Sequence, residues 1–484
     1  TLCASDLGST QQNSNDSRHL TSTLSIKDTT INVTTTGNPS QWNGICVLDG
    51  DANVTYTTAT DYAPLVLGQT YNFSHSLTMK GNSKLYCLHS NADDPSNYAV
   101  DGLSGYNGSI TLQDNAYLEA QGRAASGGNA GCGVVCDGDI TVKDNATLKA
   151  TAQGPAISTW GDVKAFGGKI IAKSSGSNGI YASGAISIGN AEGEIEGFYP
   201  ALFGDGDVSV DNSVLVATST DDVAIYSASG TVTLKNSKVD ANGADGRYGI
   251  LSSNGVNASG SWIETTGPET LDEEPDSIEN SVLFNGNDGK VIGNAGIPSD
   301  ATVDANMTLD VPEGTKLIVP QGKTLTNNGK IAVKGAIEKA GTIVCNSHSG
   351  GTATCKDKAK CDVCDEPYGE TDPKNHTNLK LFPAKAATAD AEGNIEYWYC
   401  DGCGKYFSDK EAVKEIKKAD TVTAKMDSKV VSLDDEKSAD AKPANKIPQT
   451  GDSSNPALWI ALLFVSGVVL AGTSLMVKKS KNGR

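Results

Sequence analysis

The chain has 484 residues, a formal net charge of −19 and an aromatic content of only 6%. This acidic balance excludes a nucleic-acid-binding protein, because such proteins carry basic patches that contact phosphates. The 53 glycines and few aromatic residues favour many short strands joined by tight turns over a helical protein. The chain is longer than one typical domain, so we expect several parts. It opens with Thr1, and we expect it to be a mature or truncated piece of a longer protein.

A repeated unit of short strands dominates the first half of the chain. In each unit two apolar residues stand two positions apart, as in Ile140/Val142, so both side chains lie on one face of a strand. A second pair follows, as in Leu148/Ala150, and then a small residue and a large one. The units start at Gly108, Gly138, Gly161, Gly184, Gly206, Gly230 and Gly255. One such unit cannot bury its inner face alone, so neighbouring units must stack.

Three strands per unit, with Gly and Asp-Gly corners, predict a right-handed parallel β-helix of about 22–25 residues per coil. We assign residues 1–267 to this β-helix and residues 268–344 to further or capping coils. A β-sandwich is the structural alternative, since its strands also recur at short spacing. The repeats resemble the β-helical repeats of surface proteins from Gram-positive gut anaerobes. That resemblance implies a carbohydrate-binding or adhesin-like protein.

The eleven cysteines fall into two groups. Five lie among the coils, where Cys136 takes the position of a small inward residue and is expected to be buried. Disulfides among these five stay open, because pairing cannot be deduced from sequence. The other six lie between residues 345 and 403, with two histidines. A Cys-x2-Cys turn directs two thiolates to one centre, and a His with another Cys completes the tetrahedron that zinc prefers.

We therefore predict one complete zinc site and one partial site. The first consists of His348, Cys355, Cys361 and Cys364, and the second of His376, Cys400 and Cys403, with Cys345 as a candidate fourth ligand. Disulfide bonding is the alternative for an extracellular protein. The stretch 396–408 resembles a zinc-ribbon-like module of anaerobe surface proteins, which implies a metal-stapled fold. We assign residues 345–419 to this module and the polar residues 420–446 to a flexible linker.

The chain closes, over residues 447–484, with a pentapeptide, an apolar span and a basic tail. The span, 457–477, is long enough to cross a bilayer as a transmembrane helix. The order resembles the cell-wall sorting signal of Gram-positive surface proteins; the pentapeptide is Ile447, Pro448, Gln449, Thr450 and Gly451, with isoleucine in place of the usual leucine. The resemblance implies that a sortase cleaves between Thr450 and Gly451 and joins Thr450 to peptidoglycan. The alternative is an ordinary single-pass anchor.

No recognisable catalytic motif occurs in the coils. Most acidic residues there sit beside glycine, as in Asp49-Gly50-Asp51, and Asp-Gly is a turn signature. A stack of such corners is also a candidate Ca²⁺ site, since calcium prefers oxygen ligands.

We predict a cell-wall-anchored, extracellular protein without catalytic activity that binds host or dietary glycans, or another cell's surface. Outward rows of Thr, Asn, Asp and Lys suit polar ligands, and Tyr181 or Tyr226 could stack on sugar rings, although coil packing also explains each tyrosine. A β-helical polysaccharide lyase or glycosidase is the first alternative. A structural stalk is the second.

Overall fold

The computed structural model describes residues 23–35, 40–42, 44–58, 63–67, 75–90, 100–105, 108–124, 130–266 and 277–427. The chain divides into two compact units, Thr1–Lys385 with Asn394–Val422, and Ala386–Gly393 with Thr423–Arg484. The solenoid and the cysteine-rich region both belong to the first unit. In the described part, strands and turns dominate, and the 3-10 helix η3 (Lys418–Thr421) is the one helix assigned.

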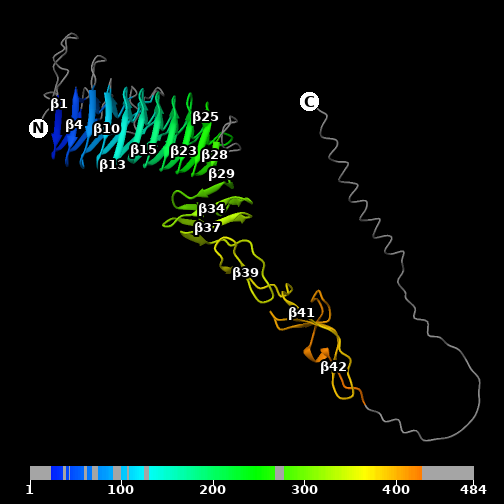
Figure 1. Cartoon of the computed structure of the whole chain (residues 1–484). Coiled ribbons are helices and arrows are strands. Elements are labelled where there is room, and N and C mark those ends of the chain that lie inside the picture. Colours follow the sequence, from blue (N-terminus) through cyan, green and yellow to red (C-terminus); the bar gives the residue numbers. More distant parts are fainter. Residues whose placement is uncertain are drawn as a thin grey trace, which may run out of the picture. The chain divides into compact units, whose positions relative to one another are not determined.

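Stacked parallel strands form the three faces of a solenoid (Figure 1). The first face contains β1 (Thr23–Lys27), β4 (Ile45–Asp49), β7 (His75–Met79), β10 (Gly108–Leu112), β13 (Ile140–Ala152), β15 (Val163–Ser174), β17 (Ile186–Gly189), β20 (Val208–Asp211), β23 (Val232–Lys235), β26 (Val256–Ser259) and β28 (Ser277–Glu279).

The second face continues each coil around the next corner. It contains β2 (Thr30–Thr35), β5 (Asn53–Thr58), β8 (Lys84–His89), β11 (Tyr117–Gln121), the later halves of β13 and β15, β18 (Glu192–Gly197), β21 (Val214–Ser219), β24 (Lys238–Asn242), β27 (Trp262–Thr266) and β29 (Ser281–Asn285). The third face is a separate nine-stranded sheet of β3 (Ser40–Trp42), β6 (Leu65–Leu67), β9 (Leu103–Gly105), β12 (Val134–Cys136), β14 (Ile157–Thr159), β16 (Ile180–Ala182), β19 (Leu202–Gly204), β22 (Ile225–Ser227) and β25 (Ile250–Ser252).

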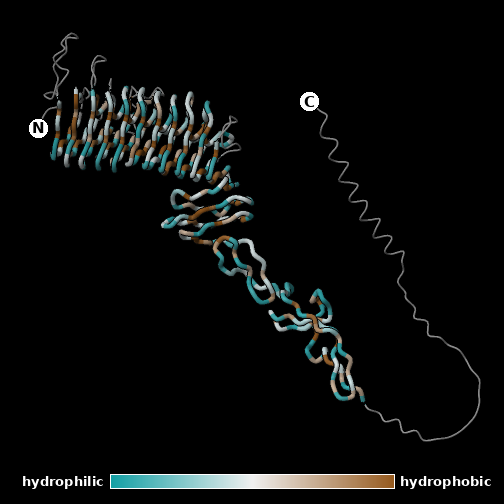
Figure 2. The backbone as a smooth tube through the Cα atoms, viewed as in Figure 1, coloured by the Kyte–Doolittle hydropathy of each residue, from teal (hydrophilic) through white to brown (hydrophobic). Residues whose placement is uncertain are grey.

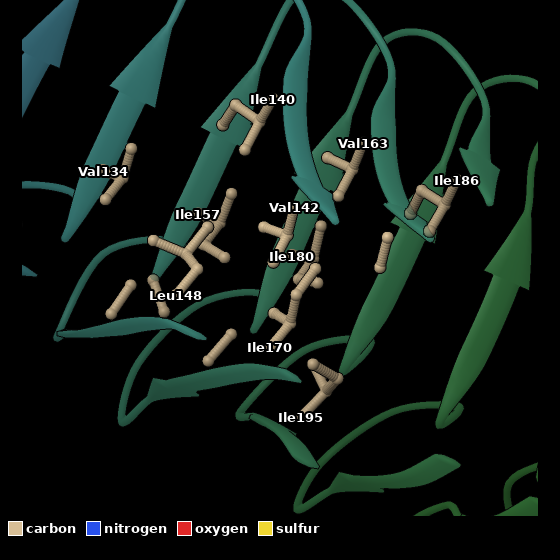
Figure 3. Close-up of a cluster of buried hydrophobic side chains, with 14 of the residues drawn as sticks. Val134, Ile140, Val142, Leu148, Ile157, Val163, Ile170, Ile180, Ile186 and Ile195 are labelled. Carbon is tan, nitrogen blue, oxygen red and sulfur yellow. The ribbon is translucent and has the colours of Figure 1, made fainter. Parts of the chain in front are cut away.

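The predicted inward positions meet in one core. Strand pairing is in register, so Ile140 lies beside Val163 and Leu148 beside Ile170 in the next coil. Figure 3 shows Ile140, Leu148 and Ile157, one from each face, pointing into the same interior. Buried apolar and outward polar residues alternate along the strands, which Figure 2 shows as alternating brown and teal. The prediction of a stacked parallel β-solenoid is therefore confirmed.

One corner explains the recurring Asp, Asn and Gly residues. Between the first and second faces each coil has a residue with φ between 47° and 84°: Asp28, Gly50, Gly81, Asp114, Asp144, Gly167, Asn190, Asn212, Asn236, Gly260 and Asn280. Glycine adopts this left-handed conformation freely, and Asn and Asp are its common non-glycine occupants. The interpretation of Asp49-Gly50 as a turn fits this geometry.

A buried row of serines supports this corner from the inside. The Oγ of Ser213 accepts the backbone N–H of Ala191 at 3.1 Å, and the Oγ of Ser237 accepts that of Ser213 at 3.1 Å. Ser261 and Ser281 repeat the contact in the next two coils at 3.2 and 3.1 Å. Each serine satisfies a buried backbone donor of the preceding coil, which otherwise costs stability.

A second, shorter set of coils follows an antiparallel hairpin between β29 and β30 (Asp288–Ile292). Its remaining strands are β31 (Asn294–Gly296), β32 (Ala301–Val303), β33 (Thr308–Val311), β34 (Lys316–Val319), β35 (Thr324–Asn327), β36 (Lys330–Val333), β37 (Ala336–Lys339) and β38 (Thr342–Cys345). Strand β27 serves both cores, because Ile263 packs into the first core and Trp262 into the second, with Phe284 at 5.4 Å between ring centroids. The second set thus has a hydrophobic core of its own.

Short antiparallel strands build the cysteine-rich region. They are β39 (Ala359–Lys360), β40 (Pro367–Tyr368), β41 (Leu379–Phe382), β42 (Gly393–Asn394), β43 (Tyr397–Cys400), β44 (Tyr406–Phe407), β45 (Glu415–Ile416) and β46 (Val422–Thr423). No helix within the described ranges is long and apolar enough to cross a membrane. The predicted transmembrane helix, the sorting pentapeptide and most of the predicted linker lie outside those ranges.

Candidate metal centres and ligand-binding surfaces

Two groups of four ligand atoms form in the cysteine-rich region. One contains Cys345, His348, Cys361 and Cys364, and the other contains Cys355, His376, Cys400 and Cys403. Within each group all the ligand atoms lie within 4.8 Å of one another. Each group could therefore hold a metal ion such as Zn²⁺.

The structure corrects the predicted division of the ligands. Cys355 belongs with His376 and not with His348, and Cys345 completes the first group and not the second. The prediction assigned Cys355 to the nearest Cys-x2-Cys turn in sequence. In the structure Cys345 ends the last coil strand, β38, and its side chain packs beside Cys361 and Cys364 in the second core. Both groups are complete, so the second site is not partial.

The ligand separations match a tetrahedral zinc site. Bonds of about 2.3 Å to sulfur and about 2.0–2.1 Å to nitrogen place neighbouring ligand atoms about 3.5–3.8 Å apart. The Sγ atoms of Cys355 and Cys400 are 3.5 Å apart. The Nδ1 atoms of His348 and His376 lie 3.4 and 3.5 Å from the Sγ atoms of Cys364 and Cys403. A single tetrahedral ion fits these spacings.

The two Cys-x2-Cys turns have the same backbone geometry. The N–H of Asp365 donates to the Cys361 carbonyl at 3.0 Å, and the N–H of Gly404 donates to the Cys400 carbonyl at 2.8 Å. Both donors have positive φ, 66° and 73°. The N–H of each first cysteine in turn bonds to a carbonyl five residues later, at 2.9 and 3.0 Å. The two turns therefore share one backbone motif.

An aromatic ring orients each histidine. His348 stacks on Tyr368 with ring centroids 5.4 Å apart, and His376 packs against Phe407 at 4.5 Å. Each aromatic residue stands four positions after the second cysteine of its turn. Outer groups that fix a histidine ring tune the ligand it presents. These two aromatic residues were missed in the sequence, although their equal spacing from Cys364 and Cys403 was a readable signal.

Backbone N–H groups favour the thiolate in both turns. Burial raises the pKa of Cys361, but hydrogen bonds from surrounding N–H groups and His348 outweigh it and lower the pKa to about 6. Burial likewise raises the pKa of Cys400, while hydrogen bonds from Cys403 N–H and neighbouring side chains lower it to about 7. A deprotonated sulfur is the form that binds a metal.

The two groups interlock along the chain. Cys355 lies in the loop between His348 and Cys361 of the first group, yet it is a ligand of the second. That loop is held by the Cys355 N–H donating to the Asn375 carbonyl at 2.9 Å. Each site thus takes its first cysteine from the preceding module, Cys345 from the last coil and Cys355 from the first turn module. A bound ion would connect consecutive modules.

The ten cysteines in the described ranges are free thiols. Cys136 is buried, as predicted, and its thiol donates to the Gly108 carbonyl at 2.6 Å. The 3.5 Å between Cys355 and Cys400 exceeds the 2.03–2.05 Å of a disulfide bond. In the described ranges, the groups of side chains that could hold a metal ion are the two Cys/His groups. No group of carboxylates there supports the predicted Ca²⁺ site.

A row of hydroxyl side chains runs along the first face. Thr78 pairs with Thr111, and Thr111 with Thr141. After Lys164 the row continues through Ser187 and Ser209, whose Oγ atoms are 3.1 Å apart, to Thr233. All of these side chains point outward, opposite the buried residues of their strands. The solenoid therefore carries a polar row with one side chain per coil.

Aromatic residues form a shorter row on the third face. Tyr181, Phe203 and Tyr226 occupy equivalent positions in successive coils. The rings of Tyr181 and Phe203 stack at 5.0 Å with an interplanar angle of 6°, and Phe203 meets Tyr226 edge-on at 5.3 Å. These rings pack coil against coil, the simpler of the two roles considered for the tyrosines. Trp160 lies beyond the row, after β14, with 71% of its surface exposed.

Two carboxylates from adjacent coils lie side by side on β24 and β27. Asp240 is in register with Glu264, whose Oε1 accepts the indole N–H of Trp262 at 2.6 Å. The Nζ of Lys238 lies 3.8 Å from Asp240. Burial raises the pKa of both carboxyls, and the nearby Asp304 adds to the rise. The interpretation of acidic residues as Asp-Gly turns did not predict this pair. The alternation of side chains along β24 and β27 places both carboxylates on the outward side.

No protein-family model, no curated protein and no solved structure matches the chain.

Proposed function

We propose that the protein is a sortase-anchored cell-surface protein whose right-handed β-solenoid binds glycans without cleaving them. The observation that carries the proposal is the outward hydroxyl row on the first face. Strands about 4.8 Å apart repeat a hydroxyl group on either side of Lys164, three before it and three after it. A repetitive polyhydroxylated ligand, such as a polysaccharide or a glycan-coated surface, can bond to several coils at once. Each contact is weak, and their number supplies the strength.

The anchor proposal rests on the sequence at 447–484. The pentapeptide, the apolar span and the basic tail follow one another in the order of a sorting signal. In this proposal Thr450 is joined to peptidoglycan, and the described modules lie outside the cell. The two Cys/His groups then act as structural zinc sites, since four protein ligands fill a tetrahedral ion and leave no open position for a substrate.

The carboxylate pair favours one alternative, a β-helical glycosidase or lyase. Glycoside hydrolysis uses two carboxyl groups, of which the general acid has a raised pKa. Asp240 and Glu264 meet the requirement for a pair and for raised pKa values. However, the indole of Trp262 already bonds to Glu264, and burial, with a contribution from Asp304 of the second set of coils, accounts for the raised pKa values.

A glycan array probed with the full chain tests the proposal. Saturable binding to one glycan class is the expected result, and it should weaken when Thr111 and Thr141 are replaced by valine, which keeps shape and strand preference. Thr151→Val is the matched control, because Thr151 also points outward but lies on the second face. Equal loss in the control would show that the row is not the binding element. If the chain binds no glycan, the glycan-binding proposal is wrong and the structural stalk becomes the favoured alternative.

A further inference from the structure

A polar groove runs along the corner between the first and second faces. It has a volume of about 570 Å³, within the range of ligand sites, and its lining includes Asp144, Gly168, Asn190, Asn212 and Asn236. These residues belong to five successive coils. At about 4.8 Å per coil the groove is therefore about 19 Å long. The length suits an extended ligand better than a compact one.

Three asparagines at left-handed corner positions provide most of the hydrogen-bonding capacity. Asn190, Asn212 and Asn236 have φ of 50°, 49° and 47°, and all three are exposed. The Nδ2 of Asn212 donates to the Oδ1 of Asn190 at 2.5 Å, which fixes the orientation of both carboxamides. A carboxamide has two N–H donors and an oxygen with two lone pairs, so this one contact leaves most of their capacity for a ligand.

The opposite wall comes from the second set of coils. Pro298 and Ser299, between β31 and β32, and Lys323, just before β35, line the same groove. Residues of both coil sets therefore line the groove.

The charges in the groove balance. Two carboxylates, Asp144 and Glu192, stand against two ammonium groups, Lys169 and Lys323, and Lys169 pairs with Glu192 at 3.5 Å. Among the described residues that line the groove none is aromatic, and Val214 is the largest apolar one. The lining thus offers neither a net field for an ionic ligand nor a platform for an apolar one. Amides and hydroxyls in a long, neutral groove suit a chain of hydroxyl groups.

We propose that this groove binds an uncharged linear oligosaccharide along the solenoid axis, with the carboxamides of Asn190, Asn212 and Asn236 bonding to hydroxyls of successive sugar units. The inference rests on the proposed glycan binding and adds to the hydroxyl row a second site, the corner groove, with its own ligand class. Hydrogen bonds to sugar replace hydrogen bonds to water, so each adds little. Many copies of the protein on one cell would strengthen the attachment.

Isothermal titration calorimetry with the full chain tests this site. The probes are linear hexasaccharides of glucose and of xylose, and a hexasaccharide of galacturonic acid as the charged comparison. We expect an uncharged probe to bind more tightly than the charged one. The double variant Asn212→Gly with Asn236→Gly should bind about 30-fold more weakly, since two hydrogen-bonding groups at about 1 kcal/mol each are lost and about 1.4 kcal/mol corresponds to a tenfold change in affinity. Glycine adopts the corner conformation without strain, so the fold should persist.

Two further variants complete the design. Asp114→Gly is the matched control, because Asp114 is an exposed corner residue with φ of 57° that does not line the groove. The affinity of this variant for the uncharged probe should stay within twofold of wild type. Ser299→Trp fills the groove from the other wall and should weaken binding independently. Unchanged affinity in both groove variants, or tighter and salt-dependent binding of the charged probe, would overturn the groove site while leaving surface glycan binding intact. No binding of any glycan would overturn both.

Discussion

At the scale of single residues, the solenoid depends on small polar side chains in fixed places. The buried serine row shows this most clearly, because Ser237 accepts the Ser213 N–H and donates to the Lys235 carbonyl at 2.7 Å. The Ser213 N–H is buried, and without the Ser237 hydroxyl it would lose this acceptor. The Lys235 carbonyl also accepts the Asn212 N–H at 2.8 Å, so it is the Ser213 donor that depends on the serine.

Ser237→Ala should lower the free energy of unfolding by about 1–3 kcal/mol, the cost of leaving a buried donor without its acceptor. Ser209→Ala, on the outward hydroxyl row, should change it by less than about 0.5 kcal/mol. Urea denaturation followed by circular dichroism gives both values. Similar losses in the two variants would contradict the role assigned to the buried row.

The carboxylate pair should make stability depend on pH. The pKa values of Asp240 and Glu264 are raised by burial in the folded chain, so between the unfolded and folded values the folded state binds more protons. The contribution of this pair to stability is therefore largest at low pH and falls as the pH rises through that window, above about pH 4. The double variant Asp240→Asn with Glu264→Gln should flatten this dependence and raise the thermal midpoint at pH 7. An unaltered slope in the double variant would contradict the assignment.

At the scale of elements, the repeated strands could be predicted from the sequence. Contacts that depend on where a strand ends, or on the register between two strands, could not. The spacing of Ile140/Val142 and Leu148/Ala150 was enough to place two faces of the coils that begin at Gly108 and after it, since a period-2 pattern specifies which side chains are buried. The prediction placed Cys345 and Cys355 in each other's metal group. The group to which Cys345 belongs depends on where the last coil strand, β38, ends, and the sequence pattern did not specify that position. Asp240 and Glu264 were missed because their meeting depends on the register between β24 and β27.

Single ligand substitutions test the interlocked metal groups. Cys345→Ser and Cys355→Ser should each reduce bound zinc from two ions per chain to one, as measured by elemental analysis after mild reduction. Limited proteolysis should then distinguish them. Cys345→Ser should expose the segment around Cys361, and Cys355→Ser the segment around Cys400. Cys132→Ser, a thiol among the coils, should keep both ions.

The reverse pattern of cleavage would restore the division predicted from sequence. A wild-type chain with no zinc and no titratable thiols would show instead that the cysteines form disulfides.

At the scale of the whole molecule, the proposal joins two kinds of observation. The solenoid and its polar rows are seen in the structure, and the proposed attachment to a wall rests on the sequence at 447–484, outside the described ranges. In the proposal the protein is attached to the wall at its C-terminal end and binds glycans through the solenoid. Metal ions that connect consecutive modules would stabilise the region between those two parts. Removing the ions with a chelator should therefore loosen the cysteine-rich region and leave the coils folded.

Thr450→Ala should abolish covalent attachment, because the proposed sortase step forms an acyl link at the Thr450 carbonyl and depends on recognition of its side chain. Fractionation of cells expressing the full chain should find wild type in the wall fraction and the variant in the membrane or the medium. Ser453→Ala, just after the pentapeptide, is the control and should stay in the wall. Wall attachment of the Thr450 variant would contradict the sorting proposal.

The most direct test of the central claim is to incubate the full chain with the glycan it binds best and to analyse the mixture by mass spectrometry while measuring binding. The account predicts saturable binding and an intact glycan after prolonged incubation. Shortened or unsaturated products that disappear in Asp240→Asn would contradict it and establish the carboxylate pair as a catalytic site.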